Sequence, residues 1–213
     1  MKITKLGHCC LVVEVKGARI LTDPGTYSTA QNSVTGIDII LITHEHHDHL
    51  HVDSLQQVLR NNPDAEIITN ASVGKILSEK GIKFTLLTDG MSLTAKGILF
   101  EAFGRIHAEI YQEYNRVENT GYLLNESFFY PGDALTVPPK KVSGLALPVA
   151  GTWVKCQEVI DYALRLHPKA CFPVHDGMIK PGFHAPFHNL PARILSEAGI
   201  KFIVPEEEKP FEL

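Results

Sequence analysis

Hydrophobic and polar positions alternate in short runs over the first part of the chain. "KITKL" (2–6), "CLVVEV" (10–15) and "ARILTDPG" (18–25) each have the length and composition of a β-strand, and a Lys-Gly turn separates the last two. "IDIILIT" (37–43) is almost continuously apolar, which is typical of a strand covered on both faces. The pattern therefore predicts a hairpin-rich opening followed by a buried strand.

Apolar residues then recur at helical spacing. Val52, Leu55, Val58 and Leu59 predict a helix, which the Asn-Asn-Pro sequence at 61–63 ends. The same reasoning predicts helices at about 72–80 and 154–167, and strands at 65–69, 91–95, 97–103, 121–125, 127–133, 144–150 and 170–174. Closely spaced strands come first and helices separate the later ones, so we expect an α/β (α+β) fold with mixed sheets in a single domain, residues 1–213.

Two nine-residue segments are nearly identical. "ILSEKGIKF" (76–84) returns as "ILSEAGIKF" (194–202), and each predicts a helix whose C-terminal glycine leads into a strand. The repeat indicates either two related halves or the same local solution to a helix-to-strand turn, and we favour the second because the segment is short. The last residues, "PEEEKPFEL" (205–213), are predicted to form a solvated tail.

The composition is that of an ordinary globular protein. Of 213 residues, 44% are hydrophobic and 21% are charged, and the net charge of −4 indicates no attraction to nucleic acid or to an anionic membrane. The N-terminal segment has no apolar stretch of signal-peptide length and no segment approaches a membrane span, so we expect a cytoplasmic protein. The cysteines have no CxxC spacing and lie in apolar runs, which predicts buried, reduced thiols at Cys9, Cys10, Cys156 and Cys171.

The segment "ITHEHHDHLH" (42–51) contains five histidines and follows the buried strand directly. It does not fit the HExxH zinc motif, which needs a histidine where this chain has Asp48. In an extended segment, side chains at i and i+2 share a face, so His44 and His46 can bind one ion while a turn brings Asp48 and His49 to a second. The spacing therefore predicts two half-sites.

A metal ion needs three or more protein ligands, so further ligands must come from elsewhere in the chain. His107 follows "FEAFGRI", Asp133 follows "SFFYPG" and His175 follows "ACFPV". Each comes at or just after the end of a predicted strand, where a fold can gather distant residues into a cleft. An adventitious metal-binding histidine tract would explain residues 44–51 alone, but it leaves Asp133 and His175 without a role.

These motifs together resemble the metallo-β-lactamase superfamily of binuclear hydrolases. The resemblance rests on "THEHHDH", His107, "YPGDA" and "PVHDG". "GHCCLVVEVKGARILTDPG" and the stretch from "LPVAGTW" to "PVHDG" resemble its branch of lactonase-like and phosphodiesterase-like metal-dependent hydrolases, which includes the ascorbate-6-phosphate lactonase family. The similarity extends from residue 3 to about residue 180, and it implies a four-layer αββα sandwich with metals at one edge of the two sheets.

The resemblance also implies a complete ligand set. The first ion would be held by His44, His46 and His107, the second by Asp48, His49 and His175, and Asp133 would bridge them. Asp133 stands where true β-lactamases tend to have cysteine, which disfavours antibiotic hydrolysis. His46 stands where diiron, oxygen-reducing relatives place glutamate, which disfavours redox chemistry.

The expected activity follows from two divalent ions. They would share a water, lower its pKa toward about 7 and hold it as hydroxide beside a polarised carbonyl or phosphoryl oxygen. Asp48 is the expected proton acceptor. Histidine and carboxylate ligands suit Zn²⁺, which we expect, and also Mn²⁺ or Fe²⁺. The expected substrate is a small, anionic lactone or ester and second a phosphodiester, with a non-catalytic metal-binding protein as the rival function; the sequence predicts no oligomeric state.

Several neighbouring residues have two interpretations. His8 either supports a ligand or is a core or surface histidine. Asp23 either caps the turn before Pro24 or, as we favour, fixes the tautomer of a ligand histidine. His184 and His188 either meet an anionic substrate or lie in a plain loop. Trp153 is expected to pack at the start of its helix.

The remaining candidates flank the histidine ligands. We expect His47 to be a solvated neighbour of the ligands and His51 to lie at the start of the next helix. The loop after His107 contains Tyr111, Tyr114, Arg116 and Asn119. It predicts either a substrate-facing lid, with Arg116 available for a phosphate or carboxylate, or an exposed polar hairpin.

Overall fold

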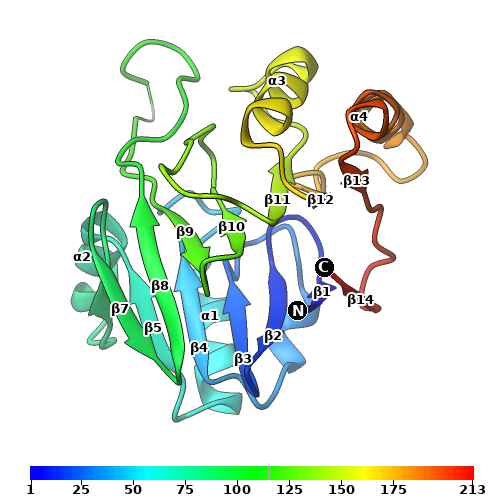
Figure 1. Cartoon of the computed structure of the whole chain (residues 1–213). Coiled ribbons are helices and arrows are strands. Elements are labelled where there is room, and N and C mark those ends of the chain that lie inside the picture. Colours follow the sequence, from blue (N-terminus) through cyan, green and yellow to red (C-terminus); the bar gives the residue numbers. More distant parts are fainter. Residues whose placement is uncertain (115) are drawn as a thin grey trace.

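Two seven-stranded sheets stack against each other in the computed structural model, which describes residues 1–114 and 116–213 (Figure 1). The first sheet has the order β14-β1-β2-β3-β4-β5-β6 and consists of β1 (Lys2–Lys5), β2 (Leu11–Val15), β3 (Ala18–Thr22), β4 (Ile39–Ile42), β5 (Glu66–Thr69), β6 (Thr85–Leu86) and β14 (Pro210–Glu212). The second has the order β13-β12-β11-β10-β9-β8-β7 and consists of β7 (Ser92–Ala95), β8 (Ile98–Phe103), β9 (Gly121–Leu124), β10 (Phe128–Tyr130), β11 (Gly144–Pro148), β12 (Ala170–Val174) and β13 (Lys201–Phe202).

Helices cover the outer face of each sheet. They are α1 (Val52–Asn61), α2 (Ala71–Glu79), α3 (Cys156–Leu166) and α4 (Ala185–Glu197), with a short 3₁₀ helix, η1, at Ala30–Ser33. One apolar cluster lies between the sheets, a second joins α1 and α2 to the first sheet, and a third joins α3 and α4 to the second. The expected four-layer αββα sandwich is therefore confirmed. None of the helices in the described residues is long and apolar enough to span a membrane.

Strand direction sets where the functional residues meet. In the first sheet, β1 and β3 are both antiparallel to β2, and β3, β4 and β5 are parallel, so the C-terminal ends of β1, β3 and β4 lie at one edge. In the second sheet, β8 and β10 are both antiparallel to β9, and β10, β11 and β12 are parallel. The ends of β8, β10, β11 and β12 therefore share one edge as well. Ligands bind preferentially outside such carboxyl ends in open α/β sheets.

The end of the chain differs from the prediction. Pro210–Glu212 pairs antiparallel with β1 as strand β14, so the segment is not wholly a solvated tail. The side chain of Phe211 explains the difference, because it packs against the core between the sheets and its ring lies 5.0 Å from that of Phe172. The two chain ends lie beside each other (Figure 1), and the Leu213 N–H donates a hydrogen bond to the Met1 carbonyl.

The two nearly identical segments occupy corresponding places in the two sheets. One forms the end of α2 and leads to β6, and the other forms the end of α4 and leads to β13; both strands are the outermost parallel strands of their sheets. Gly81 and Gly199 have φ of 67° and 78°, a conformation that favours glycine after a helix. The shared turn geometry agrees with a common local solution, and the matching positions agree equally with two related halves.

Candidate metal centre

The seven expected ligands come together at the shared edge of the two sheets. His44, His46, Asp48 and His49 lie in the loop after β4, His107 follows β8, Asp133 follows β10 and His175 follows β12. They form two groups whose ligand atoms lie within 4.8 Å of one another: His44, His46 and His107, and Asp48, His49, Asp133 and His175. These groups match the ligand sets that the resemblance implies, except that Asp133, the expected bridge, falls in the second group.

Asp133 also approaches the first group. Its Oδ2 lies 3.3 Å from His107 Nε2 and 3.9 Å from His44 Nε2. The same oxygen lies 2.7 Å from His175 Nε2, and Oδ1 lies 3.1 Å from His49 Nε2. A carboxylate between two groups of imidazoles has the position that a bridging ligand requires.

Hydrogen bonds of Nδ1 fix which ring nitrogen is free in His107 and His44. His107 Nδ1 lies 2.6 Å from the Ala108 carbonyl oxygen, which can only accept, so Nδ1 carries the proton. His44 Nδ1 lies 3.0 Å from Thr43 Oγ1, and this hydroxyl donates in turn to Asp23 Oδ2 at 2.7 Å. The Nε2 atoms of His44, His46, His49 and His107 are buried and have no hydrogen-bond partner in the described part of the chain. A neutral imidazole with a free Nε2 lone pair is the form that binds metal ions.

Burial and the neighbouring charges set the protonation of His44 and Asp133. Burial, together with the neighbouring His49, holds the pKa of His44 well below its usual range. Burial opposes the ionised form of Asp133, but His175 and His49 outweigh burial and hold the pKa of this carboxyl well below its usual range. Asp133 is therefore a carboxylate at neutral pH, and His44 is a neutral imidazole; both are competent ligands.

Asp23 is a buried hydrogen-bond partner of His49. It follows β3 directly and is fully buried. Its Oδ2 lies 2.7 Å from His49 Nδ1, so the carboxylate orients the His49 ring and leaves Nε2 free. This contact agrees with the favoured interpretation of Asp23 as the partner of an expected ligand histidine.

His8 contacts Asp48, the other acidic residue of the second group. Its Nδ1 accepts a hydrogen bond from the Gly177 N–H at 3.1 Å, so the proton is on Nε2, which lies 3.2 Å from Asp48 Oδ2. Gly177 must be glycine for this contact, since a Cβ there would lie 2.8 Å from the His8 Cβ. His8, Asp23 and His175 have φ of 38°, 36° and 61°. Such left-handed conformations are costly for residues other than glycine and cluster at functional sites.

Two residues contact Asp133 in a way that was not expected. The Trp153 indole N–H donates to Asp133 Oδ2 at 3.0 Å, and Trp153 precedes α3 instead of packing at its first turn. Asn119 is buried and accepts from the Asp133 N–H through Oδ1 at 2.9 Å. The sequence carries only a weak signal for Trp153, which follows a predicted strand as the ligands do, and none for Asn119.

The other candidates are outside both ligand groups. His47 is exposed, with Nε2 3.4 Å from the Tyr27 hydroxyl, and His51 precedes the first residue of α1, as expected. Arg116 is exposed and pairs with Glu113 at 2.9 Å, and Tyr111 and Tyr114 pair across an exposed turn. These residues fit the exposed hairpin; Asn115, within the same segment, lies outside the described residues.

His184 and His188 line a different hollow from the metal ligands. It is also lined by Lys5 and Asp176. His188 belongs to α4, and its Nε2 lies 3.0 Å from Asp176 Oδ2. The loop interpretation of His188 is therefore wrong, because the helix begins earlier than its prolines suggest: Pro186 occupies the first turn, where its missing N–H costs little.

A hollow of about 230 Å³ opens onto the ligand groups. Its polar lining consists of His46, His47, Asp48, His107, Asp133, Thr152 and His175. Its walls are apolar or aromatic and include Tyr27, Ile110, Trp153 and Met178. The hollow gives a small molecule access to the face of both ligand groups.

Comparisons with known proteins agree with this architecture. The family model described as "Beta-lactamase superfamily domain" matches residues 2–175. Protein Rv0786c of Mycobacterium tuberculosis is 36% identical over 186 residues, which cover 85% of this chain and 86% of that protein. A UPF0173 metal-dependent hydrolase of Koribacter versatilis is 26% identical over 200 residues, covering 83% and 84%. A solved metallo hydrolase from Ignicoccus hospitalis has the same fold, with a TM-score of 0.79 and 21% identity over 100% of this chain and 98% of that one.

Proposed function

The chain belongs to the β-lactamase superfamily, and from that premise we propose that it is a metal-dependent hydrolase that cleaves a small lactone or ester with two divalent ions. One observation carries the proposal. Six of the seven convergent ligand side chains bury a nitrogen or oxygen without a hydrogen-bond partner among the described residues: His44, His46, His49, His107, Asp133 and His175. Unpartnered buried polar atoms are costly, so their concentration at one place points to an ion-binding role.

The donor set fits the proposed ions. Imidazole and carboxylate ligands suit Zn²⁺ first, and Mn²⁺ or Fe²⁺ as alternatives. The first ion is assigned to the His44, His46 and His107 group and the second to Asp48, His49 and His175, with Asp133 between them. When bound, two such ions lower the pKa of a shared water and polarise the oxygen of a carbonyl or phosphoryl group.

Asp48 is the residue that we assign to proton transfer. Its side chain is 12% exposed and lines the hollow, so it can reach a bound substrate. Burial opposes its ionised form, but the neighbouring His175 and His8 imidazoles outweigh burial and hold its pKa well below the usual range. Asp48 therefore starts as a carboxylate that can accept a proton and pass it to the leaving group. The Nε2–H of His8 holds it in place.

The side chains in the walls of the hollow indicate which charge the substrate carries. Tyr27, Ile110, Trp153 and Met178 offer apolar surface, and no lysine or arginine is among the described residues that line the hollow. This wall chemistry favours an uncharged lactone or ester over the anionic one that the sequence suggests. A phosphodiester is the second candidate, because a two-ion centre accepts either carbonyl or phosphoryl oxygen. The cytoplasmic location remains a prediction.

The proposal is tested by a substrate screen of zinc-loaded protein. We expect turnover of uncharged lactones or p-nitrophenyl esters to exceed that of bis-p-nitrophenyl phosphate. Asp48→Asn should lower kcat about a hundred- to ten-thousandfold while zinc remains bound. His47→Ala is the control, since His47 is exposed and outside both ligand groups. Faster phosphodiester cleavage would reverse the order of substrates, and two bound ions without any turnover would favour a non-catalytic metal-binding protein.

A further inference from the structure

Cys9 lies beneath the second ligand group. It is part of the tight turn between β1 and β2, in which the Cys10 N–H donates to the Gly7 carbonyl at 2.9 Å. The Cys9 carbonyl accepts from Thr22 Oγ1 at 2.8 Å and from the Tyr130 hydroxyl at 2.7 Å. These bonds fix the backbone of Cys9, and only 2% of the residue is exposed.

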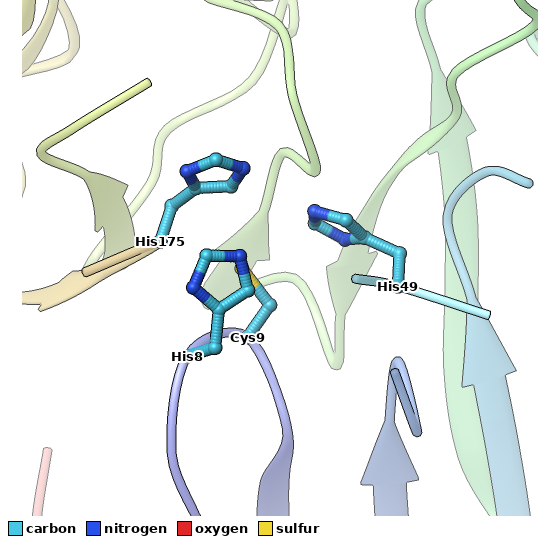
Figure 2. A group of neighbouring side chains, drawn as sticks. All are labelled: His8, Cys9, His49 and His175. Carbon is cyan, nitrogen blue, oxygen red and sulfur yellow. The ribbon is translucent and has the colours of Figure 1, made fainter. Parts of the chain in front are cut away.

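Cys9 completes a third group of potential ligands. One donor atom each from His8, Cys9, His49 and His175 lies within 4.8 Å of the others, and all four residues are buried. Figure 2 shows the three imidazole rings gathered around Cys9, each coming from a different loop. Thiolate and imidazole together are typical zinc ligands.

The histidines of this group still have free donor atoms. His49 Nε2 and both ring nitrogens of His175 are buried and lack hydrogen-bond partners in the described part of the chain. His175 Nε2 faces Asp133 and Asp48, at 2.7 and 3.4 Å, so this nitrogen points to the second metal position. His8 is already committed, because Gly177 and Asp48 occupy its two nitrogens. The available set is therefore Cys9, His49 and His175.

We propose that Cys9 is an additional ligand at the second metal position, where with His49 and His175 it forms a thiolate–imidazole set that selects thiophilic ions such as Zn²⁺, Co²⁺ and Cd²⁺. The inference deepens the proposed metal centre and rests on it, because both ligand sets use His49 and His175. A buried thiolate without a cation is costly, so the thiolate forms together with ion binding. Soft sulfur donors favour zinc over manganese. A Cys9 ligand would therefore make the second position selective among the metals that histidine and carboxylate ligands alone accept.

Cobalt absorption spectroscopy tests this ligand directly and needs no substrate. Co²⁺ added to the metal-free protein should produce visible d–d bands from any protein-bound ion and a near-ultraviolet thiolate-to-cobalt band from a Co–S bond. We expect Cys9→Ala to lose the thiolate band while it keeps d–d absorption. Cys10→Ala is the matched control: Cys10 is the adjacent buried cysteine, but it packs in the apolar cluster beneath α1 and α2 and should retain the thiolate band.

If Cys9→Ala does not fold, the cobalt spectrum of the wild-type protein alone tests the role of Cys9. Cobalt bound with d–d bands and no thiolate band would overturn the role of Cys9 and leave the proposed centre intact. No bound cobalt at all would overturn the centre and the inference together. A thiolate band that persists in folded Cys9→Ala would assign the sulfur ligand to another cysteine and overturn the inference alone.

Discussion

At the scale of single residues, Asp23 orients histidines of the proposed metal centre although it does not line the hollow beside them. Its Oδ2 receives three groups at 2.7 Å: His49 Nδ1, Thr43 Oγ1 and the Tyr130 hydroxyl. Because Thr43 Oγ1 also contacts His44 Nδ1, the same carboxylate orients one histidine of each ligand group.

We therefore predict that Asp23→Asn weakens zinc binding about ten- to a hundredfold, since such partners set ring orientation and ligand basicity. Competition with a chromophoric chelator measures the affinity. Asp38→Asn is the control, because Asp38 accepts a backbone N–H from Arg19 before β4 begins, whereas the ligand loop follows the end of β4. An equal loss of zinc affinity in the two variants would mean that Asp23 acts only through the stability of the fold.

Residue types and spacing were enough to predict the seven side chains that the fold brings together, because histidines and carboxylates at strand ends are unusual outside metal centres. Trp153, Asn119 and Cys9 were not predicted at the site. Their contacts arise from packing between distant loops: Asn119 has the sequence context of an ordinary loop amide, and Cys9 that of one of two buried cysteines. Only the alternation of adjacent side chains at the turn gives Cys9 and Cys10 different surroundings.

At the scale of elements, the loop after β3 determines where the ligand loop after β4 can lie. Gly25 packs directly on the backbone of Asp48 and His49, and the Thr26 N–H donates to the His47 carbonyl at 2.9 Å. A Cβ at Gly25 would overlap the Asp48 carbonyl group.

Gly25→Ala is predicted to destabilise the fold by about 1–3 kcal/mol, as overpacking does, and to weaken binding of the second ion by shifting Asp48 and His49. Chemical unfolding and zinc titration measure the two effects. Gly17→Asn is the matched control: its φ of +82° suits asparagine, and a Cβ there meets nothing within 4 Å. A Gly25→Ala protein with wild-type stability and zinc affinity would show that the two loops adjust independently.

Most strands and helices could be predicted from periodicity, and the exceptions have physical causes. Strand β14 contains a proline and has acidic neighbours nearby in sequence, and its pairing depends on Phe211 reaching a distant core. Helix α4 contains Pro186 and Pro191, which argue against a helix locally, yet Pro191 is buried. In both cases long-range packing outweighs the local pattern.

At the scale of the whole molecule, a buried charge network connects the two sheets. Lys5 of β1 pairs with Asp176, which follows β12 in the second sheet, and Asp176 also contacts His188 of α4. Burial alone raises the pKa of Asp176, but His188 and Lys5 outweigh burial and lower the pKa to about 2.

A lowered pKa adds stability above the unfolded value of about 4, and this stability is lost as the pH falls through about 2. The expected contribution is about 2–3 kcal/mol, since a tenfold change in proton affinity corresponds to about 1.4 kcal/mol. In chelator-treated protein, the difference in unfolding free energy between wild type and Asp176→Asn should therefore shrink by about that amount between about pH 5 and about pH 2. Urea unfolding across this range measures it, and a difference that does not change with pH would remove Asp176 from the acid response.

The number of zinc ions per chain tests the two-ion centre most directly. Elemental analysis of chelator-stripped protein, reloaded with zinc and freed of excess metal, should give two equivalents for wild type and for His47→Ala. His46→Ala should give about one, because it removes one of the three histidines of the first group while the second stays complete. A limit of one zinc in the reloaded wild type, or the same loss in His47→Ala as in His46→Ala, would contradict the two-ion centre built from these seven ligands.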